Sequence, residues 1–310
     1  MQPPMHDVII IGSGSAGYTA AIYACRAGRK TLILAGSIPG GQLMITSDVE
    51  NFPGFPEGVL GPELMEKLRR QAEKFGPEII YDDVTLVDFS SRPFKVVAGG
   101  KSYDGKSVII ATGANAKWLG LPSETKFRGK GVSSCATCDG FFFKGKDVVT
   151  VGGGDTAMEE ATFLANITNS VTVVHRRDML RASKIMQERA VANPKIRFVW
   201  DSTIKEITGD DKVTGVQLHN LKSGRDTHLK AEGVFVAIGF EPNTEFLKGK
   251  VDLDSQGYIV TRKDTETSVP GVFAAGDVRD HKYRQAVTAA ADGCKAAIDS
   301  DHFLAEHHKN

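Results

Sequence analysis

Short apolar runs alternate with amphipathic or alanine-rich stretches along most of this 310-residue chain. Residues 7–11 (DVIII) form a β-branched run that leads into a glycine-rich turn and an alanine-rich stretch ending near residue 27. The same order recurs where residues 147–151 (DVVTV) precede a second glycine-rich turn and a helix predicted over residues 157–165. A buried strand, a turn and a helix in this order predict a nucleotide-binding α/β unit, and the chain contains two of them.

The segments around these two units predict the remaining elements. Strands are predicted at residues 31–35, 85–89, 94–97, 107–113, 170–174, within 204–229, and at 234–239 and 269–277, and helices at 62–75 and 286–297. We therefore predict an α/β fold with two Rossmann-like nucleotide-binding domains of three layers, each combining a parallel sheet with a small antiparallel sheet. The second unit is inserted in the first, because residues 269–297 resume the pattern of the first unit.

The first turn reads Gly12-Ser13-Gly14-Ser15-Ala16-Gly17. Gly12 permits the tight turn, Gly14 lets a pyrophosphate approach the backbone, and Gly17 lets the helix lie close on the sheet. A glycine turn that binds nothing is the alternative. The next strand ends at Gly36, where an acid that binds a ribose usually stands, so the adenosine must be held in another way.

The second turn, Gly152-Gly153-Gly154-Asp155-Thr156-Ala157, is a variant of the same motif. Here the next strand ends in His175-Arg176-Arg177, with Arg181 one turn further on. Guanidinium groups at this position suit the 2′-phosphate of NADP, which they can grip with two hydrogen bonds. The alternative is that the arginines bind no ligand and only form the solvated start of a helix.

Two further segments carry candidate ligand contacts. Gly40, Gly41, Gln42 and Asn51 stand in a long loop whose amide groups can reach a planar ring system, although such residues also form plain surface turns. Asp277 follows an apolar strand and precedes a helix, which is where ligands bind in open α/β sheets.

Cys135 and Cys138 form a C-x-x-C pair that is followed at once by Asp139. Cysteines at this spacing meet on one helical turn and can form a disulfide, and the neighbouring carboxyl can exchange a proton with a leaving thiolate. The same spacing makes half of a zinc site, but the other cysteines, Cys25 and Cys294, are isolated on alanine-rich helices and expected to be buried. Redox chemistry is therefore favoured, and no metal site is expected.

Composition narrows the class of protein. The chain has 38 basic and 38 acidic side chains, so nothing indicates a nucleic-acid partner. No apolar run approaches the roughly 18 residues that a membrane span needs, and residues 1–7 show no signal pattern. A paired C-x-x-C in a reducing compartment is typically catalytic, and we expect a cytoplasmic protein without membrane contact.

Together these motifs resemble those of the low-molecular-weight thioredoxin reductases, in the same order and over nearly the whole chain. The resemblance implies a homodimer in which an FAD domain (residues 1–117 and 244–310) is split around an inserted NADPH domain (118–243) that carries the cysteines. FAD contacts are implied for Gly12, Gly14, Ser15, Ala16, Gly17, Gly36, Gly40, Gly41, Gln42, Leu43, Asn51, Gly276, Asp277, Arg284, Gln285 and Ala286. NADPH contacts are implied for Gly152, Gly154, Asp155, Thr156, Ala157, His175, Arg176, Arg177 and Arg181.

The same resemblance implies a thioredoxin-disulfide reductase that uses NADPH and FAD. Cys138 would face the flavin, Cys135 would attack the disulfide of thioredoxin, and Asp139 would serve as acid and base. The inserted domain would rotate between the two half-reactions, with hinges near Trp118 and residues 242–244.

Three alternatives remain open at this point. The cysteines could serve another redoxin or a peroxidase partner, since the partner surface carries no readable motif. A flavin dithiol oxidase would use the same scaffold, but it would not need the three arginines. A nucleotide sensor without turnover is disfavoured because the C-x-x-C-D sequence is intact.

Overall fold

The computed structural model describes residues 5–46 and 48–307. The chain folds as two compact units. Unit 1 comprises the described residues up to Asn115 and those from Glu241 onward, and unit 2 comprises Ala116–Phe240. These limits differ by two and three residues from the predicted domain limits of 118 and 243. Which nucleotide each unit binds stays a prediction.

Unit 1 is built on a sheet with the strand order β5-β2-β1-β8-β7-β6, and β19 also pairs with β8. Strands β5, β2, β1, β8 and β19 are mutually parallel, whereas β7 and β6 continue the sheet in antiparallel fashion. The strands are β1 (Met5–Ile11), β2 (Thr31–Leu34), β5 (Glu78–Ile80), β6 (Val84–Asp88), β7 (Phe94–Ala98), β8 (Lys101–Ile110) and β19 (Val272–Ala274), with a separate hairpin of β3 (Asp48–Val49) and β4 (Val59–Leu60). The helices are α1 (Ser15–Arg26), α2 (Gly61–Glu73) and α7 (Ala286–His307), with short η1 (Gly41–Ile45), η3 (Glu245–Leu247) and η4 (Gly276–Val278).

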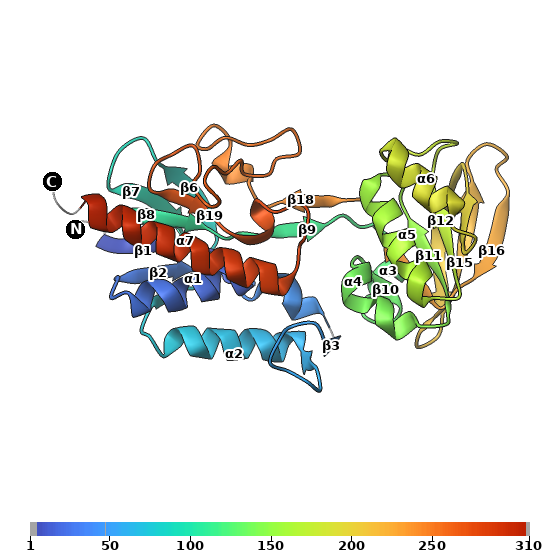
Figure 1. The fold of residues 1–310 in the computed structure, drawn as a ribbon, viewed down its shortest axis with the longest axis horizontal. Coiled ribbons are helices and arrows are strands. Elements are labelled where there is room, and N and C mark those ends of the chain that lie inside the picture. Colours follow the sequence, from blue (N-terminus) through green and yellow to red (C-terminus); the bar gives the residue numbers. More distant parts are fainter. Residues whose placement is uncertain (1–4, 47, 308–310) are drawn as a thin grey trace. The chain divides into compact units, whose positions relative to one another are not determined.

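Alternate residues of β1 supply two different hydrophobic cores in unit 1. Ile10 packs with α1, α2 and α7 on one face of the sheet, while Ile9 packs with β6, β7 and the segment after η3 on the other. Helices α1 and α7 lie side by side over the parallel strands (Figure 1). Their close approach needs Gly293, because a Cβ there would overlap the backbone oxygen of Ala16.

Unit 2 contains a parallel sheet with the strand order β10-β17-β11-β12-β13 and an antiparallel sheet of β14, β15 and β16. The strands are β10 (Val132–Ser133), β11 (Asp147–Val151), β12 (Ser170–Val174), β13 (Ile196–Val199), β14 (Ser202–Gly209), β15 (Val213–Asn220), β16 (Asp226–Lys230) and β17 (Gly233–Val236). The helices are α3 (Pro122–Phe127), α4 (Ala136–Asp139), α5 (Asp155–Ile167) and α6 (Lys184–Ala192), with the short η2 (Gly140–Phe143).

Unit 2 has three layers because both faces of its parallel sheet are buried. Val148 and Val173 pack with α5 on one face, and Val149 and Val174 pack with β14 and β15 on the other. Such strands read as continuous apolar runs. The predicted α/β fold, with parallel sheets and small antiparallel sheets, is confirmed.

The chain passes between the units twice, through β9 (Ala114–Ala116) and β18 (Phe240–Pro242), which pair as a two-stranded sheet (Figure 1). The Lys117 backbone N–H donates to the Gly239 carbonyl at 2.9 Å, and the Asn243 N–H donates to the Gly113 carbonyl at 3.0 Å. The two connections are therefore joined by hydrogen bonds along their length.

Candidate active site

Cys135 and Cys138 form a disulfide within unit 2, with their Cα atoms 5.3 Å apart. Cys135 caps the single turn of α4, so the backbone N–H groups of Cys138 and Asp139 both donate to its carbonyl oxygen, at 3.3 and 3.1 Å. The Ser133 hydroxyl accepts a hydrogen bond from the Cys135 N–H at 3.0 Å. The turn that brings the two sulfurs together is thus held by backbone hydrogen bonds within it and by the Ser133 hydroxyl before it.

Asp139 lies at the end of this turn and is only partly exposed. Burial raises the pKa of its carboxyl, and a hydrogen bond from the Ser133 hydroxyl opposes that shift. A carboxyl with a raised pKa keeps a proton at higher pH than an exposed aspartate does. The group beside the cysteines is therefore suited to give up a proton and to take it back.

The first glycine turn has the steric features that a phosphate-binding turn needs. Gly12 has φ 113°, and a Cβ there would overlap the Ala111 carbonyl oxygen. A Cβ on Gly17 would overlap the carbonyl oxygen of Gly12, whereas a Cβ on Gly14 would meet no atom within 4 Å. Gly12 and Gly17 are therefore required by packing, and Gly14 borders open space where a ligand can approach the backbone.

Ser13 connects this turn to the loop after β2. Its hydroxyl donates to the Ala35 carbonyl at 2.7 Å and accepts from the Gly40 N–H at 3.1 Å. Gly40 and Gly41 have φ values of 97° and 65°, a left-handed conformation that glycine adopts without strain. The structure thus brings the first turn and the Gly40-Gly41 loop together through Ser13.

Amide side chains of the predicted set meet partners far away in the sequence. Asn51 donates to the Gln285 side-chain oxygen at 3.3 Å, so two predicted residues from opposite ends of the chain lie together. Gln42 donates to Asn115 at 2.8 Å, and Asn115 in turn donates to the side-chain oxygen of Asn243 at 2.9 Å. This network of amide side chains lies in unit 1, at the positions where the chain leaves that unit and returns to it.

Asp277 lies in η4, directly after β19, and is partly buried. Burial raises its pKa to about 7, the negative charge of Asp280 adds to the shift, and Arg284 opposes it. The preceding Gly276 has φ 77°, and a Cβ there would come within 3.1 Å of the Ala16 side chain in the first turn. A carboxyl in this state can donate or accept a hydrogen bond, which fits the hydroxyl groups of a nucleotide cofactor.

The second glycine turn repeats the first. Gly152 has φ 151°, and a Cβ there would overlap the Ala237 carbonyl, just as one on Gly12 would overlap that of Ala111. A Cβ on Gly154 would meet nothing within 4 Å, as at Gly14. The side chain of Ala157, at the position of Gly17, is fully buried. Gly14 and Gly154 therefore leave each turn open for the phosphates of a nucleotide to approach the backbone.

The segment from His175 to Ser183 follows β12 and passes beside this second turn. His175 is 4% exposed, and its Nε2 donates to the Met179 carbonyl at 3.0 Å. Burial lowers the pKa of His175, and the nearby arginines lower it further. Arg176, Arg177 and Arg181 are exposed, so the three guanidinium groups lie at the surface of unit 2, on the segment that follows β12.

A family model described as pyridine nucleotide-disulphide oxidoreductase matches residues 6–293. The chain belongs to this family. It is 56% identical over 304 residues to the thioredoxin reductase of Streptomyces coelicolor, and this alignment covers 97% of this chain and 94% of that protein.

Two solved structures of thioredoxin reductases match this chain over nearly its full length. A thioredoxin reductase from Giardia duodenalis superposes with a TM-score of 0.94 at 46% identity, covering 97% of this chain and 99% of that one. One from Streptococcus pyogenes gives 0.93 at 46% identity, covering 98% and 100%. The resemblance to thioredoxin reductases that the motifs predict is confirmed.

Several residues around the sites of this pyridine nucleotide-disulphide oxidoreductase were not predicted from sequence. Ser13 joins the first turn to its neighbours, and Asp83 accepts from both the N–H and the hydroxyl of Ser37, just after Gly36. Ser183 bonds to Asp155 in the second turn. Only Ser13 had a sequence signal, since it lies inside the glycine motif.

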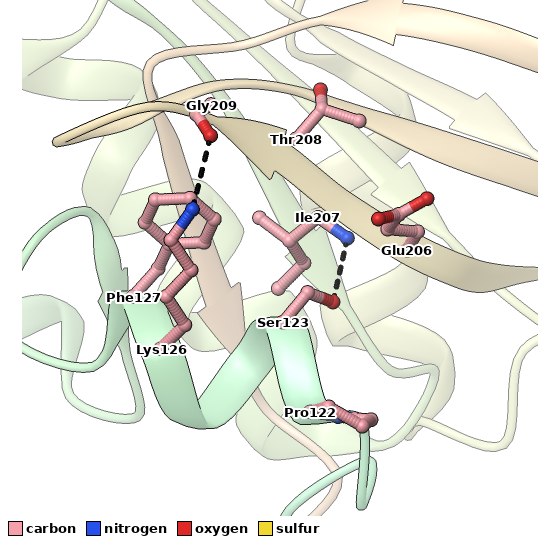
Figure 2. A pocket seen from close by; sticks show the side chains of 8 residues that line it. All are labelled: Pro122, Ser123, Lys126, Phe127, Glu206, Ile207, Thr208 and Gly209. Carbon is pink, nitrogen blue, oxygen red and sulfur yellow. Dashed lines mark hydrogen bonds between the residues drawn. The ribbon is translucent and has the colours of Figure 1, made fainter.

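A surface groove of about 450 Å³ lies in unit 2 of this family member, between α3 and β14. Ser123 accepts from the Ile207 N–H at 3.0 Å, and Lys126 donates to the Gly209 carbonyl at 3.4 Å (Figure 2). The predicted site residues are not among those that line it, so this groove is separate from the glycine turns and the disulfide.

Within residues 5–46 and 48–307, no group of three His, Cys, Asp or Glu side chains is placed to hold a metal ion. In the same residues, no helix combines the length and apolar character that a membrane crossing needs. Cys25 and Cys294 take part in no disulfide and are partly exposed, so the expectation that both are buried is wrong.

Proposed function

We propose that this protein is an NADPH-dependent thioredoxin-disulfide reductase that contains FAD. The observation that carries the proposal is the Cys135–Cys138 disulfide with the partly buried Asp139 beside it, in a unit that also contains a glycine turn and three exposed arginines. The relatives support the acceptor, because proteins at 46–56% identity are named thioredoxin reductases.

Each unit would hold one nucleotide. Unit 1 would hold FAD through the first glycine turn, the Gly40-Gly41 loop, Asn51 with Gln285, and Asp277. Unit 2 would hold NADPH through the second turn and the arginines that follow β12. When bound, FAD would take an electron pair from NADPH and deliver it to a disulfide, which is chemistry that the side chains alone do not supply.

The cysteines would then act in a fixed order. With the pair reduced, the Cys135 thiolate attacks one sulfur of the thioredoxin disulfide, which forms a mixed disulfide and releases the other sulfur as a thiolate. The Cys138 thiolate then attacks the Cys135 sulfur, which restores the disulfide and frees reduced thioredoxin. Asp139 exchanges the protons, since its raised pKa keeps the acid form available.

Unit 2 would move relative to unit 1 during turnover, because the same two sulfurs must meet first a flavin and then a protein. Only the two connecting segments would need to bend, near Trp118 and residues 242–244. A crosslink that joins the two units tests this motion. Undiminished thioredoxin reduction by the crosslinked enzyme would contradict it. We further infer a homodimer and a cytoplasmic location, the latter from the balanced charge and the catalytic type of cysteine pair.

The test of the function is an anaerobic titration of the flavin-containing protein with NADPH and, separately, with NADH. Oxidised thioredoxin is then added while the flavin absorbance is followed. Bleaching at low NADPH concentration, with recovery only when thioredoxin is present, is the expected result. The Cys135→Ser, Cys138→Ser double variant is the control, because it should bleach but not recover.

Two other results would redirect the proposal. Bleaching by NADPH without recovery would keep both nucleotide assignments and would show that the acceptor is a different redoxin or a peroxidase. Failure of NADPH to bleach the flavin would refute the role of the arginines and would favour a dithiol oxidase.

A further inference from the structure

The arginine-bearing segment of unit 2 is tied to the second glycine turn by several independent contacts. This segment, residues 175–183, is called the arginine loop here. The backbone N–H groups of Arg181 and Ala182 both donate to the Gly153 carbonyl, at 2.7 and 3.1 Å. Gly153 must be glycine, because a Cβ there would overlap the His175 ring that opens the loop.

A further contact is made by the side chain of Asp155. The Asp155 Oδ1 atom accepts hydrogen bonds from both the N–H and the hydroxyl of Ser183, at 2.7 and 2.8 Å. Asp155 follows the three glycines of the second turn and is the first residue of α5, and Ser183 is the N-cap of α6. One carboxylate oxygen therefore links the glycine turn to the end of the arginine loop.

The loop is also held by its buried side chains. Leu180 and Ala182, which flank Arg181, lie in the core that includes Ala157 and Met158 of α5. Arg181 itself is exposed between them. Its backbone is fixed on both sides while its guanidinium faces solvent, so the position from which it can reach a ligand is set before any ligand arrives.

The charge of Asp155 argues against direct contact with the nucleotide. A glycine turn at a helix start receives a pyrophosphate, and a carboxylate beside that anion repels it. The same carboxylate is favourable at the start of α6, where it accepts from the N-cap residue. The contact with Ser183 thus gives Asp155 a use that does not require it to touch the phosphates.

We propose that Asp155 and Ser183 are positioning residues for the selection of NADPH: their shared hydrogen bonds hold the arginine loop against the glycine turn, so that the guanidinium groups meet the 2′-phosphate. This inference rests on the proposed function, since it assumes that unit 2 binds NADPH. The ligand class is a nucleotide with a 2′-phosphate, and the two residues act through the arginines.

The test measures binding of adenosine 2′,5′-bisphosphate and of 5′-AMP to the flavin-containing enzyme by calorimetry. Asp155→Ala and Ser183→Ala are each expected to weaken the bisphosphate by about threefold to tenfold, the effect of losing one or two hydrogen bonds, with little change for 5′-AMP. The double variant should lose no more than Asp155→Ala alone, because Asp155→Ala already removes the hydroxyl bond that Ser183→Ala removes.

Ser170→Ala is the matched control. The Ser170 hydroxyl donates to Asp147 at 2.6 Å, so the change also removes a serine–aspartate bond between β11 and β12, but at the start of those strands. It should leave the preference for the bisphosphate unchanged. A second readout needs no ligand: amide hydrogen exchange at residues 181–183 should speed up in Ser183→Ala and not in Ser170→Ala.

Two results would overturn the inference in distinguishable ways. If Asp155→Ala weakens both nucleotides equally while Ser183→Ala changes neither binding nor exchange, Asp155 contacts the nucleotide directly and the positioning role is wrong. If the wild-type enzyme binds the two nucleotides equally, the assignment of NADPH to unit 2 fails, and the inference fails with it.

Discussion

The Cα of Gly17 lies so close to the carbonyl oxygen of Gly12 that a Cβ on Gly17 would overlap it. Gly14, between them, would place a Cβ in open space. One turn therefore contains a glycine required by the fold and a glycine that the fold itself does not require.

This difference predicts opposite effects for two alanine substitutions. Gly17→Ala should destabilise the flavin-free protein by about 1–3 kcal/mol, because the helix must move away from the turn. Gly14→Ala should change its stability by less than about 0.5 kcal/mol, but should lower its FAD content after reconstitution. Melting temperatures of the flavin-free variants and their flavin absorbance check both. Equal FAD content in wild type and Gly14→Ala would contradict the proposed flavin site.

Asp139→Asn should slow thioredoxin reduction by about 100-fold or more, because the amide cannot exchange a proton with the departing thiolate. Bleaching of the flavin by NADPH before thioredoxin is added should remain. Burial raises the pKa of Asp139, so the acid form is present below that raised value and is lost as the pH rises through it. The wild-type rate should therefore fall on the alkaline side, and the variant should lack that dependence. Identical pH profiles would show that another group supplies the proton.

Asp277 predicts how the stability of the flavin-free protein depends on pH. Its pKa is raised from 3.8 to about 7 in the folded chain, so folding favours the protonated form. The resulting stabilisation is complete below about pH 4 and is lost as the pH rises through 7. Asp277→Asn should flatten the decline in melting temperature between pH 5 and 8. Asp280→Asn removes a charge that raises this pKa, so it should move the decline to lower pH.

Glu124 is fully buried, and its carboxylate accepts from the N–H groups of Leu119 and Gly120 at 2.8 and 3.0 Å. Arg128 lies 3.5 Å from the same carboxylate, and its guanidinium stacks 3.9 Å from the Trp118 ring. Glu124→Ala should destabilise unit 2 by about 2–4 kcal/mol, because the N–H groups of Leu119 and Gly120 lose their acceptor and Arg128 loses its buried partner. Glu124→Gln should cost less, since its amide oxygen can still accept one of them.

The measurement for Glu124 can be confined to one unit. The chain has two tryptophans, Trp118 and Trp200, and both lie in unit 2. The midpoint of urea unfolding followed by tryptophan fluorescence therefore reports on this unit. An unchanged midpoint in Glu124→Ala would mean that water satisfies the two N–H groups.

Elements buried on both faces were predicted well from sequence. The strands predicted at residues 147–151 and 170–174 agree with β11 and β12. A short, continuous β-branched run is typical of a strand that is buried on both faces of a parallel sheet. The correspondence of the two glycine turns was also visible in the sequence. Where two backbone segments approach so closely that a Cβ does not fit, only glycine is possible.

Boundaries set by tertiary packing were not predicted. The strand expected at residues 269–277 is only Val272–Ala274. Gly271 before it and Gly276 after it have φ values of 92° and 77°, which are incompatible with an extended strand. Helix α7 continues ten residues beyond the predicted end at 297, to His307, and Leu304 in that extension joins the core of unit 1. Neither feature is decided by neighbours in the sequence.

Side-chain contacts across long separations were the least predictable part of the site. The bonds of Asp155 to Ser183 and of Asn51 to Gln285 join residues 28 and 234 positions apart. Each uses residue types that are equally common in surface turns. Nothing local distinguishes them, so only the folded chain shows which amide or hydroxyl meets which partner.

The pairing of β9 with β18 has a consequence for how unit 1 assembles. Its two parts are separated in sequence by all of unit 2, a gap whose closure would be entropically unfavourable for a flexible chain. Once unit 2 has folded, however, the hydrogen bond from Lys117 to Gly239 holds the two ends of that gap together. For the assembly of unit 1, the folded unit 2 then behaves as a short hairpin loop. Strand β19 can therefore reach β8 as readily as if the two strands were close neighbours in the chain.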